Sequence, residues 1–373
     1  MKIIKTLILF YLIPTLLFSA LLYDVPVELK QPDGSTLYCF ASGDEYYSRL
    51  HDQNDYTITQ SNEDGFYYYA LLQNQEIVPS IYRADQNYNL AQLGFSKKVM
   101  IPQERYLEIR ERWWNGVETR DAPTTGTVNN LNVFIRFADE DEFGNARSYY
   151  DSYFNNENGP SMKHYFSEVS YDMLTVNTIH YPTSSMDSNL SYQDQYPRSY
   201  YQPYNAVTNP EGYTDSERTD REHTLLQNAI AFIESEVPDS LIIDSNNDGN
   251  VDNVTFLVYG VPGGWADLLW PHRWALYSVV SEIHGKRVWD YNFNMASGPY
   301  FSVGTLAHEF CHSLGAPDLY HYYNETAPVA VGGWDVMDAS TDIPQWMSSY
   351  IKYRYFNWIE LQDASGGGTF ELN

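Results

Sequence analysis

Residues 305–318 of the 373-residue chain read TLAHEFCHSLGAPD. His308 and His312 lie four positions apart, so on a helix they share one face and can hold the same cation. Glu309 lies beside His308, where its carboxylate can reach a water molecule on the metal and act as a general base. The stretch therefore predicts a metal-binding helix, and the rest of the chain is interpreted around it.

The residues after the second histidine provide a turn and a third ligand. Gly315 can end the helix in a left-handed conformation, and Pro317 prevents its continuation. Asp318 can then swing back toward the histidines, which leaves a fourth position open for water, as is typical of catalytic zinc. The alternative is a surface helix with two solvated histidines. It is disfavoured by the apolar neighbours Leu306, Ala307, Phe310 and Leu314.

A second motif, GGWDVMD, spans residues 332–338. Met337 is the candidate for the methionine that lies in a tight turn beneath the metal in a related class of zinc sites. A downstream glutamate in place of Asp318 stays open as an alternative third ligand, with Glu325 and Glu360 as candidates. Neither lies in a Glu-bearing helical motif, and the Met337 turn argues against both.

Residues 244–252 read DSNNDGNVD and resemble a loop for a hard cation. Gly249 stands where such a loop turns sharply, but Thr255 occupies the position at which an EF-hand requires glutamate. The oxygen ligands would come from Asp244, Asn246, Asp248, Asn250 (through its backbone carbonyl) and Asp252. We therefore expect a structural calcium site that braces the following strand. A turn of Asn and Asp residues without metal stays open.

Composition and the first residues bear on location and partners. Lys and Arg number 22 and Asp and Glu number 49, so the formal charge is 22 − 49 = −27, which excludes a phosphate-tracking nucleic-acid binder. A basic start, an apolar run and Ser19-Ala20 predict a secretory signal over residues 1–20 and a secreted protein. A membrane span needs about 20 apolar residues, and the apolar run is close to that length, so an uncleaved anchor stays open. No stable membrane span is expected after signal removal.

The chain is expected to form an α+β fold with two parts. Short strand-like runs separated by turns predict a β-rich module over residues 21–120, here called the N-terminal module. Residues 121–130 have the composition of a linker. A second domain over 131–373 opens with the alternating strand pattern Leu131–Phe137.

Three further segments carry structural expectations. Thr219, Asp220, Arg221 and Glu222 form a capping-box pattern that opens an amphipathic helix. Residues 253–260 have the pattern of a buried strand, and residues 294–303 are expected to supply the edge strand on which an extended peptide lies. Tyr320, Tyr322 and Tyr323 are candidate donors to an oxyanion, and nothing in the sequence selects one of them.

Several of these motifs together resemble one protein family. The run His-Glu-Phe-x-His-x-Leu-Gly-x-Pro-Asp-Leu-Tyr, followed by Gly-Gly-Trp-Asp-Val-Met-Asp, resembles the immune inhibitor A family of secreted zinc metallopeptidases. Residues 31–34 (QPDG) and 43–45 (GDE) look like that family's propeptide. Residues 161–174 and 269–272 (LWPH) are also similar, so the resemblance covers most of the chain.

The resemblance implies a zincin-type, metzincin-like catalytic domain with a mixed β-sheet and an active-site helix. It implies a zinc endopeptidase that acts on proteins or peptides and is made as a zymogen, with the N-terminal module as propeptide. His308, His312 and Asp318 are then zinc ligands and Glu309 is the catalytic base. Cleavage near Arg120 would release the module.

The chain departs from the family pattern in two places. Cys311 stands where the family usually has glycine, and either a small buried residue or a stray soft ligand could result. Residues 366–373 read like the start of a further β segment, which leaves open a truncation at the C-terminal end. The alternative function is a secreted calcium-binding adhesion or interaction module with an inactive peptidase-like site.

Overall fold

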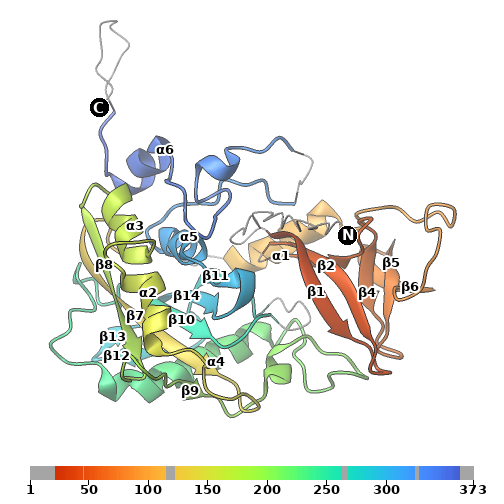
Figure 1. The fold of residues 1–373 in the computed structure, drawn as a ribbon, viewed down its shortest axis with the longest axis horizontal. Coiled ribbons are helices and arrows are strands. Elements are labelled where there is room, and N and C mark those ends of the chain that lie inside the picture. Colours follow the sequence, from red (N-terminus) through yellow and green to blue (C-terminus); the bar gives the residue numbers. More distant parts are fainter. Residues whose placement is uncertain (1–21, 45, 115–121, 263–267, 324–326, 362–373) are drawn as a thin grey trace, which may run out of the picture.

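The computed structural model of the chain describes residues 22–44, 46–114, 122–262, 268–323 and 327–361. The expected signal segment, the cut site near Arg120 and the C-terminal residues 366–373 lie outside these ranges. Helices and strands both contribute to the fold, which confirms the α+β class (Figure 1). Among the described residues, no helix is both long and apolar enough to cross a bilayer.

The N-terminal module is one antiparallel sheet whose six strands follow chain order. Its strands are β1 (Leu22–Lys30), β2 (Thr36–Gly43), β3 (Ser48–His51), β4 (Thr57–Gln60), β5 (Tyr67–Gln73) and β6 (Glu76–Arg83). Cys39 lies in its core with Leu29, Leu37 and Ile58. Burial raises the pKa of the Cys39 thiol to about 12, so this cysteine is a packing residue. Helix α1 (Gln103–Trp114) follows the sheet.

The second domain is built on a mixed sheet in the order β11-β14-β10-β7-β8. Its strands are β7 (Gly126–Arg136), β8 (Leu174–Tyr181), β10 (Val254–Val258), β11 (His272–Ala275) and β14 (Asp290–Met295). Strand β11 is antiparallel to β14, whereas the other pairs in this order are parallel. Since β7 begins at Gly126, residues 126–130 of the expected linker are strand. The strand expected over 253–260 is β10, and all five of its residues are buried.

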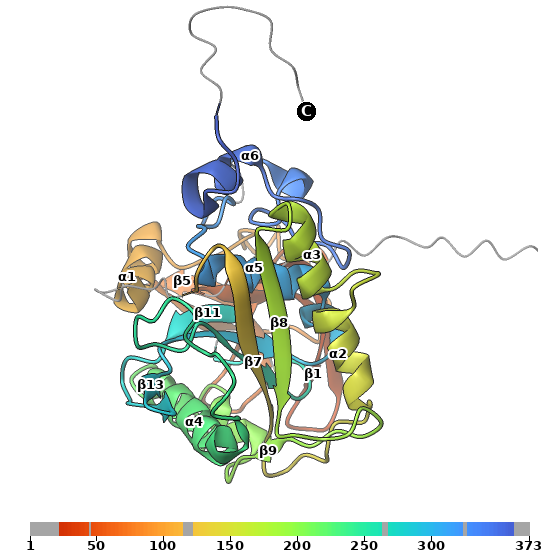
Figure 2. The ribbon, with the colours of Figure 1, turned by 90° about the vertical axis from the view of Figure 1, so that its left-hand side faces the viewer.

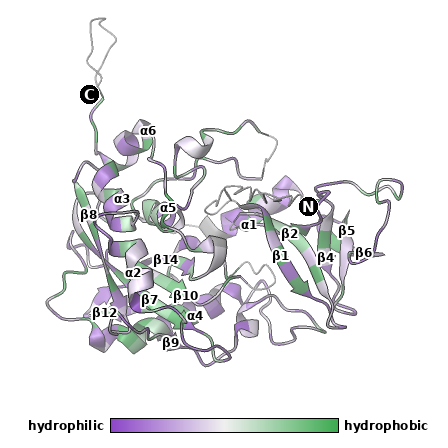
Figure 3. Cartoon of the chain, in the orientation of Figure 1, coloured by the Kyte–Doolittle hydropathy of each residue, from purple (hydrophilic) through white to green (hydrophobic). Residues whose placement is uncertain are grey.

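Helices cover both faces of the mixed sheet, and the residues of its inner strands β10 and β14 are buried on both sides. Helix α4 (Arg218–Ile233) packs on one face through Leu226 and Ile230, against Val133 of β7. Helices α2 (Arg147–Asn155), α3 (Met162–Val169) and α5 (Val303–Ser313) lie on the other face. Figure 2 shows α4 on the opposite side of the sheet from α2 and α3. Figure 3 shows the hydrophobic colour concentrated on inner strands such as β10.

The remaining elements are short. They are β9 (Tyr192–Gln193), β12 (Glu282–Ile283), β13 (Lys286–Arg287), α6 (Ser349–Ile351), four 3-10 turns (Arg198–Tyr201, Glu234–Glu236, Gly298–Tyr300 and Gly332–Trp334) and a π-helical turn (Lys352–Phe356). They connect or close the larger elements, and the turn at Gly332–Trp334 leads into the metal centre.

Two expectations about local structure are wrong. Helix α4 begins at Arg218, and its N-cap Glu217 makes no side-chain capping bond, so Thr219 lies within the helix and the capping box does not form. The side chain of Glu222 is instead buried and bonded to His272. The segment 294–303 is not an edge strand, because β14 pairs with neighbours on both sides and β11 forms the edge.

The N-terminal module packs against the second domain. The Tyr323 hydroxyl donates to the Ile101 carbonyl at 2.9 Å, and the Asn205 amide donates to the Ser61 carbonyl at 3.1 Å. Ala41 is fully buried in the core that contains α4. A cavity of about 710 Å³ lies between the two parts and is lined by residues of both, among them Arg49 and Trp274.

Candidate metal centre

Helix α5 carries the predicted metal-binding motif, and its ends are defined by side chains around it. The Ser302 hydroxyl caps the helix by accepting a hydrogen bond from the Thr305 amide at 3.0 Å. Gly304 faces the backbone of the segment 340–341 so closely that a Cβ would lie 2.1 Å from the Thr341 carbonyl oxygen. Gly315 has φ of +99°, as predicted for the residue that ends this helix. The chain then reverses toward Asp318.

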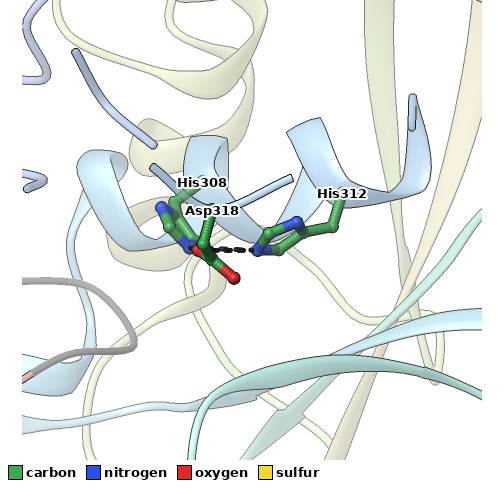
Figure 4. A group of neighbouring side chains, drawn as sticks. All are labelled: His308, His312 and Asp318. Atoms are coloured by element: carbon green, nitrogen blue, oxygen red, sulfur yellow. Dashed lines mark hydrogen bonds and ion pairs between the residues drawn. The ribbon is translucent and has the colours of Figure 1, made fainter. Parts of the chain in front are cut away.

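The three predicted ligands converge on one point (Figure 4). The Nε2 atoms of His308 and His312 are 3.1 Å apart, and they lie 3.0 Å and 3.3 Å from Asp318 Oδ1. Ligand atoms bound to a tetrahedral zinc at about 2.0–2.1 Å are separated by about 3.3–3.4 Å. The measured separations therefore match the edges of a zinc tetrahedron to within a few tenths of an ångström.

Within the part of the chain that the structure describes, this is the one group of three or more His, Cys, Asp or Glu side chains with ligand atoms within 4.8 Å of one another. Glu360 is exposed and does not join it. The other alternative ligand, Glu325, lies outside the described residues. The geometry thus favours Asp318 as the third ligand.

Backbone carbonyls fix the orientation of both histidines. His308 Nδ1 is 2.9 Å from the Val336 carbonyl oxygen, and His312 Nδ1 is 2.8 Å from that of Ala316. A carbonyl only accepts, so each Nδ1 carries a proton and each Nε2 is left to face Asp318. This arrangement is the one expected of histidines that bind a metal through Nε2.

Electrostatics tie the three side chains together. Burial acts to lower the pKa of His308, but the hydrogen bond and charge of Asp318 raise it to about 9. Burial acts to raise the pKa of Asp318, but the two histidines hold it well below its ordinary value. A divalent cation would replace the shared proton as the positive partner of the carboxylate, because metal ligands must be deprotonated.

Glu309 lies next to His308 in the chain, and one of its carboxylate oxygens has no polar partner among the described residues. The residue is 1% exposed, and its Oε1 has no hydrogen-bond partner among the residues that the structure describes. Burial raises the pKa of its carboxyl group. A buried, unpaired carboxylate is costly unless a water molecule or ion completes its environment. This orphaned oxygen, beside three converging ligands, fits a site built around a metal and its water.

The turn at residues 331–338, which contains Met337, lies against the segment that carries the ligands. Met337 is fully buried, its carbonyl accepts from the Leu319 amide at 2.8 Å, and Val336 supplies the carbonyl for His308. The side chain of Asp335 holds the turn together by accepting from the Met337 amide at 2.9 Å and the Ser348 amide at 2.7 Å. The role of Asp335 was not apparent from the sequence.

A polar face lies beneath α5, and it was not predicted from the sequence. In β14, Asp290, Asn292 and Asn294 alternate with apolar residues, and all three are buried. The Asn292 amide donates to the Glu309 carbonyl at 2.9 Å and to the Ser313 hydroxyl at 3.1 Å. The strict alternation of polar residues in this strand was the signal that could have located this face.

The LWPH segment contributes to both a core and a polar network. Trp270 is 1% exposed and belongs to the core, whereas Trp274 lines the cavity between the domains. His272 Nε2 lies 3.0 Å from Glu222 Oε1, which also accepts a hydrogen bond from the Tyr291 hydroxyl. Burial acts to raise the pKa of Glu222, but the charge and hydrogen bond of His272 lower it to about 2.

This network predicts a pH-dependent contribution to stability. A carboxyl pKa of about 2 in the folded chain, against an ordinary value of 4.5, corresponds to roughly 3 kcal/mol of stability. Because the folded pKa is depressed, this stability is fully present above pH 4.5 and is lost as the pH falls toward 2. Urea unfolding of the metal-free protein measures this effect: the free energies of unfolding of wild type and Glu222→Gln should converge by that amount as the pH falls. A difference between these two free energies that does not change with pH would contradict the pairing of Glu222 with His272.

The predicted calcium loop folds as a turn stabilised by its own side chains. Gly249 has φ of +94°, as its place in such a loop requires. The Asp248 and Gly249 amides donate to Asp244 at 3.0 Å and 3.1 Å, and Lys286 Nζ lies 2.6 Å from Asp244 Oδ2. The carboxylates of Asp244, Asp248 and Asp252 are not gathered within ligand distance of one another. Lys286 and backbone amides thus already partner Asp244, and calcium binding stays a prediction.

The lysine gives this prediction a measurable form. Calcium must displace the Lys286 ammonium group from Asp244, so Lys286→Met is expected to raise the calcium affinity several-fold. Titration calorimetry on the full chain measures it, with Asp248→Asn as the variant that should weaken binding. If neither wild type nor Lys286→Met binds calcium at millimolar concentration, the loop is a turn without metal.

Cys311 packs as a small buried residue. It is fully buried in the core formed by α3 and α5, and burial raises the pKa of its thiol well above the ordinary value. A thiol that keeps its proton is a poor metal ligand. The departure from the family's glycine therefore leaves the ligand set unchanged in this structure.

The three candidate tyrosines have different environments. The Tyr322 hydroxyl donates to Asp318 Oδ2, the oxygen that does not face the histidines. The Tyr323 hydroxyl is bonded to the Ile101 carbonyl of the N-terminal module, and Tyr320 is buried.

Comparison of the chain with family models and with curated proteins gives no match.

Proposed function

We propose that the protein is a secreted zinc-dependent endopeptidase, made as a zymogen, that hydrolyses peptide bonds in proteins. The observation that carries this proposal is the convergence of His308, His312 and Asp318 with separations of 3.0–3.3 Å, beside the unpaired carboxylate oxygen of Glu309. Two histidines and one carboxylate leave a coordination position open, as in hydrolytic rather than structural zinc sites.

The fold is consistent with a zincin-type, metzincin-like catalytic domain. Helix α5 lies on a mixed sheet with one antiparallel strand, β11, at its edge. The chain reverses after Gly315 to bring Asp318 back to the helix, and Met337 lies in a buried turn bonded to the segment that follows Asp318. These features support the resemblance to the immune inhibitor A family.

In the proposed reaction, zinc held by His308, His312 and Asp318 would supply Lewis-acid chemistry, polarising the scissile carbonyl and lowering the pKa of water. Glu309 would accept the proton of the attacking water and later deliver it to the leaving amine. Burial, which raises the pKa of Glu309, suits a group that must hold a proton between these two steps. Asn292 fixes the helix backbone at Glu309 through its hydrogen bond to the Glu309 carbonyl.

Protein and peptide chains are the proposed substrates. Among the described strands of its sheet, β11 pairs only with β14, so its other edge can add an extended peptide as a further strand. The net charge of −27 argues against nucleic acid as substrate or partner. The predicted signal segment supports a secreted location.

The zymogen proposal rests on how completely the site is covered. The side chains of His308 and Asp318 are 1% and 4% exposed and that of His312 is 16% exposed, so the ligands are largely enclosed in this arrangement. Asp44 of the N-terminal module is buried close by, and burial, with a contribution from the charge of Asp318, raises its pKa to about 6. We infer that removal of the module would increase access to the site.

Activation has a direct test. N-terminal sequencing of the active secreted form should give a mature start near Arg120, which leaves the strand β7 intact. A mature start before residue 90 would reject the proposal that the module is released.

The proposed activity can be tested by digestion of casein with the activated protein. Activity should disappear with a zinc chelator and return when zinc is added back. Activity that survives chelation would contradict a metal-dependent mechanism. No digestion by a zinc-loaded, activated chain would favour the alternative, a calcium-binding adhesion or interaction module with an inactive site.

A further inference from the structure

Tyr322 connects the third metal ligand to the N-terminal module. Its hydroxyl donates to Asp318 Oδ2, while Asp318 Oδ1 lies 3.0 Å from His308 Nε2 and 3.3 Å from His312 Nε2. The two oxygens of this carboxylate therefore have different partners. Because Asp318 is buried, the hydrogen bond to Oδ2 sets the rotation of the carboxylate and so aims Oδ1 at the metal position.

The ring of Tyr322 is held by two residues of the N-terminal module. The Arg110 guanidinium carbon lies 4.3 Å from the ring centroid, within the range of a cation–π interaction. The ring of Tyr46 meets that of Tyr322 edge-on, with centroids 5.6 Å apart and an interplanar angle of 61°. From its own domain, Tyr322 contacts Tyr320 with centroids 4.8 Å apart. The ring of Tyr322 thus contacts residues of the module and of the second domain.

A neighbouring residue offers a comparison within the same interface. The Tyr323 hydroxyl donates to the Ile101 carbonyl at 2.9 Å, and the Tyr323 ring lies 5.3 Å from that of Tyr106. Tyr323 therefore also bonds the module, but among the described residues it makes no hydrogen bond or ring contact with a metal ligand. An effect of general domain docking would involve both tyrosines, whereas positioning of Asp318 involves Tyr322 alone.

We propose that Tyr322 is a positioning residue that couples docking of the N-terminal module to metal binding by Asp318. Arg110 and Tyr46 hold the ring, the ring places its hydroxyl on Oδ2, and the carboxylate then presents Oδ1 to the ion. Coupling between two binding events is reciprocal, so the bound ion in turn strengthens docking of the module. This inference rests on the proposed function only in requiring that the site takes a divalent metal.

The test is the zinc affinity of the full chain, measured by competition with a chromophoric chelator. Tyr322→Phe keeps the ring and removes the hydroxyl, and it should weaken zinc binding by about tenfold or more, as loss of a ligand's hydrogen-bond partner does elsewhere. Arg110→Met touches no ligand and should still weaken binding, by a smaller factor. Tyr323→Phe is the matched control and should bind zinc within about twofold of wild type.

The double variant Tyr322→Phe/Arg110→Met tests whether Arg110 affects the zinc affinity through Tyr322 or independently of it. Because Arg110 acts through the Tyr322 hydroxyl, the double variant should bind zinc no more weakly than Tyr322→Phe alone. Additive losses would overturn the coupling. Wild-type affinity in Tyr322→Phe, or an equal loss in Tyr323→Phe, would also overturn it.

A spectroscopic readout distinguishes positioning from general damage. The visible absorption bands of the cobalt-substituted protein depend on the ligand geometry, so they should shift in Tyr322→Phe and stay unchanged in Tyr323→Phe. Circular dichroism checks that each variant folds, and Arg110→Met carries the test if Tyr322→Phe does not. None of these measurements requires peptidase activity, so an inactive protein with this affinity pattern would contradict the proposed function and leave the coupling standing.

Discussion

Glu309→Gln should reduce casein hydrolysis by roughly 100- to 10,000-fold, the range usually contributed by a general acid or base. Glutamine has nearly the same shape but cannot accept a proton, so it removes the step assigned to Glu309. The three ligands are untouched, and Nδ1 of each histidine keeps its backbone carbonyl. The variant should therefore bind one zinc ion with wild-type affinity.

The measurement is the rate of casein digestion by activated protein, together with its zinc content. Glu282→Gln, at an exposed glutamate in β12, is the matched control and should be fully active. Retained hydrolysis in Glu309→Gln would remove Glu309 from the role of base. If Glu309→Gln loses zinc, its inactivity says nothing about proton transfer. The activity of Glu309→Asp would then be compared with that of wild type at full zinc occupancy.

Asp318→Ala should weaken zinc binding by more than about a hundredfold. Loss of a residue that only supports a ligand costs about 10- to 100-fold in affinity, and removal of the ligand itself should cost more. Zinc content after dialysis against a weak chelator, and hydrolysis at saturating zinc, measure the effect.

The same experiment decides between Asp318 and a downstream glutamate. Glu360→Ala and Glu325→Ala should retain zinc, because the convergence of ligand atoms already includes Asp318. If Asp318→Ala retains zinc and one of the glutamate variants loses it, that glutamate is the third ligand. The chain after Gly315 would then have to follow a different path.

The parts of the site that lie within a few residues of one another could be predicted from the sequence. Four-residue spacing places His308 and His312 on one helix face, and Gly315 reverses the chain because glycine adopts a positive φ at little cost. These relations depend on local geometry, which the sequence determines directly. Met337 could be predicted only through a known class of sites, since it lies 25 residues beyond His312 and nothing local brings the two together.

Interactions between distant segments could not be predicted. Glu222 was assigned to a capping box because its local pattern fits one, yet the helix begins at Arg218 and Glu222 pairs with His272, 50 residues away. Tertiary packing overrides a local capping preference of about 1 kcal/mol when it offers a buried ionic hydrogen bond. The partnership of Tyr322 with Asp318 and Arg110 likewise depends on how two domains meet.

The order of the strands in the sheet also could not be predicted from the sequence. Residues 294–303 are expected from the sequence to supply an edge strand for an extended peptide, but the sheet places β14 between β10 and β11. The pairing partners of a strand depend on the whole topology, and an apolar face with polar alternation is compatible with both inner and edge positions. Strand β11, four residues long, gave little signal by which to identify it as the edge.

The zinc site can be examined by anomalous diffraction at the zinc absorption edge, on crystals of the full chain grown with stoichiometric zinc. We expect one strong peak bonded to Nε2 of His308, Nε2 of His312 and Oδ1 of Asp318, with Glu309 close by but not bonded. A peak elsewhere, or no peak together with the two imidazoles turned away from Asp318, would contradict the zinc site and the proposed peptidase activity with it.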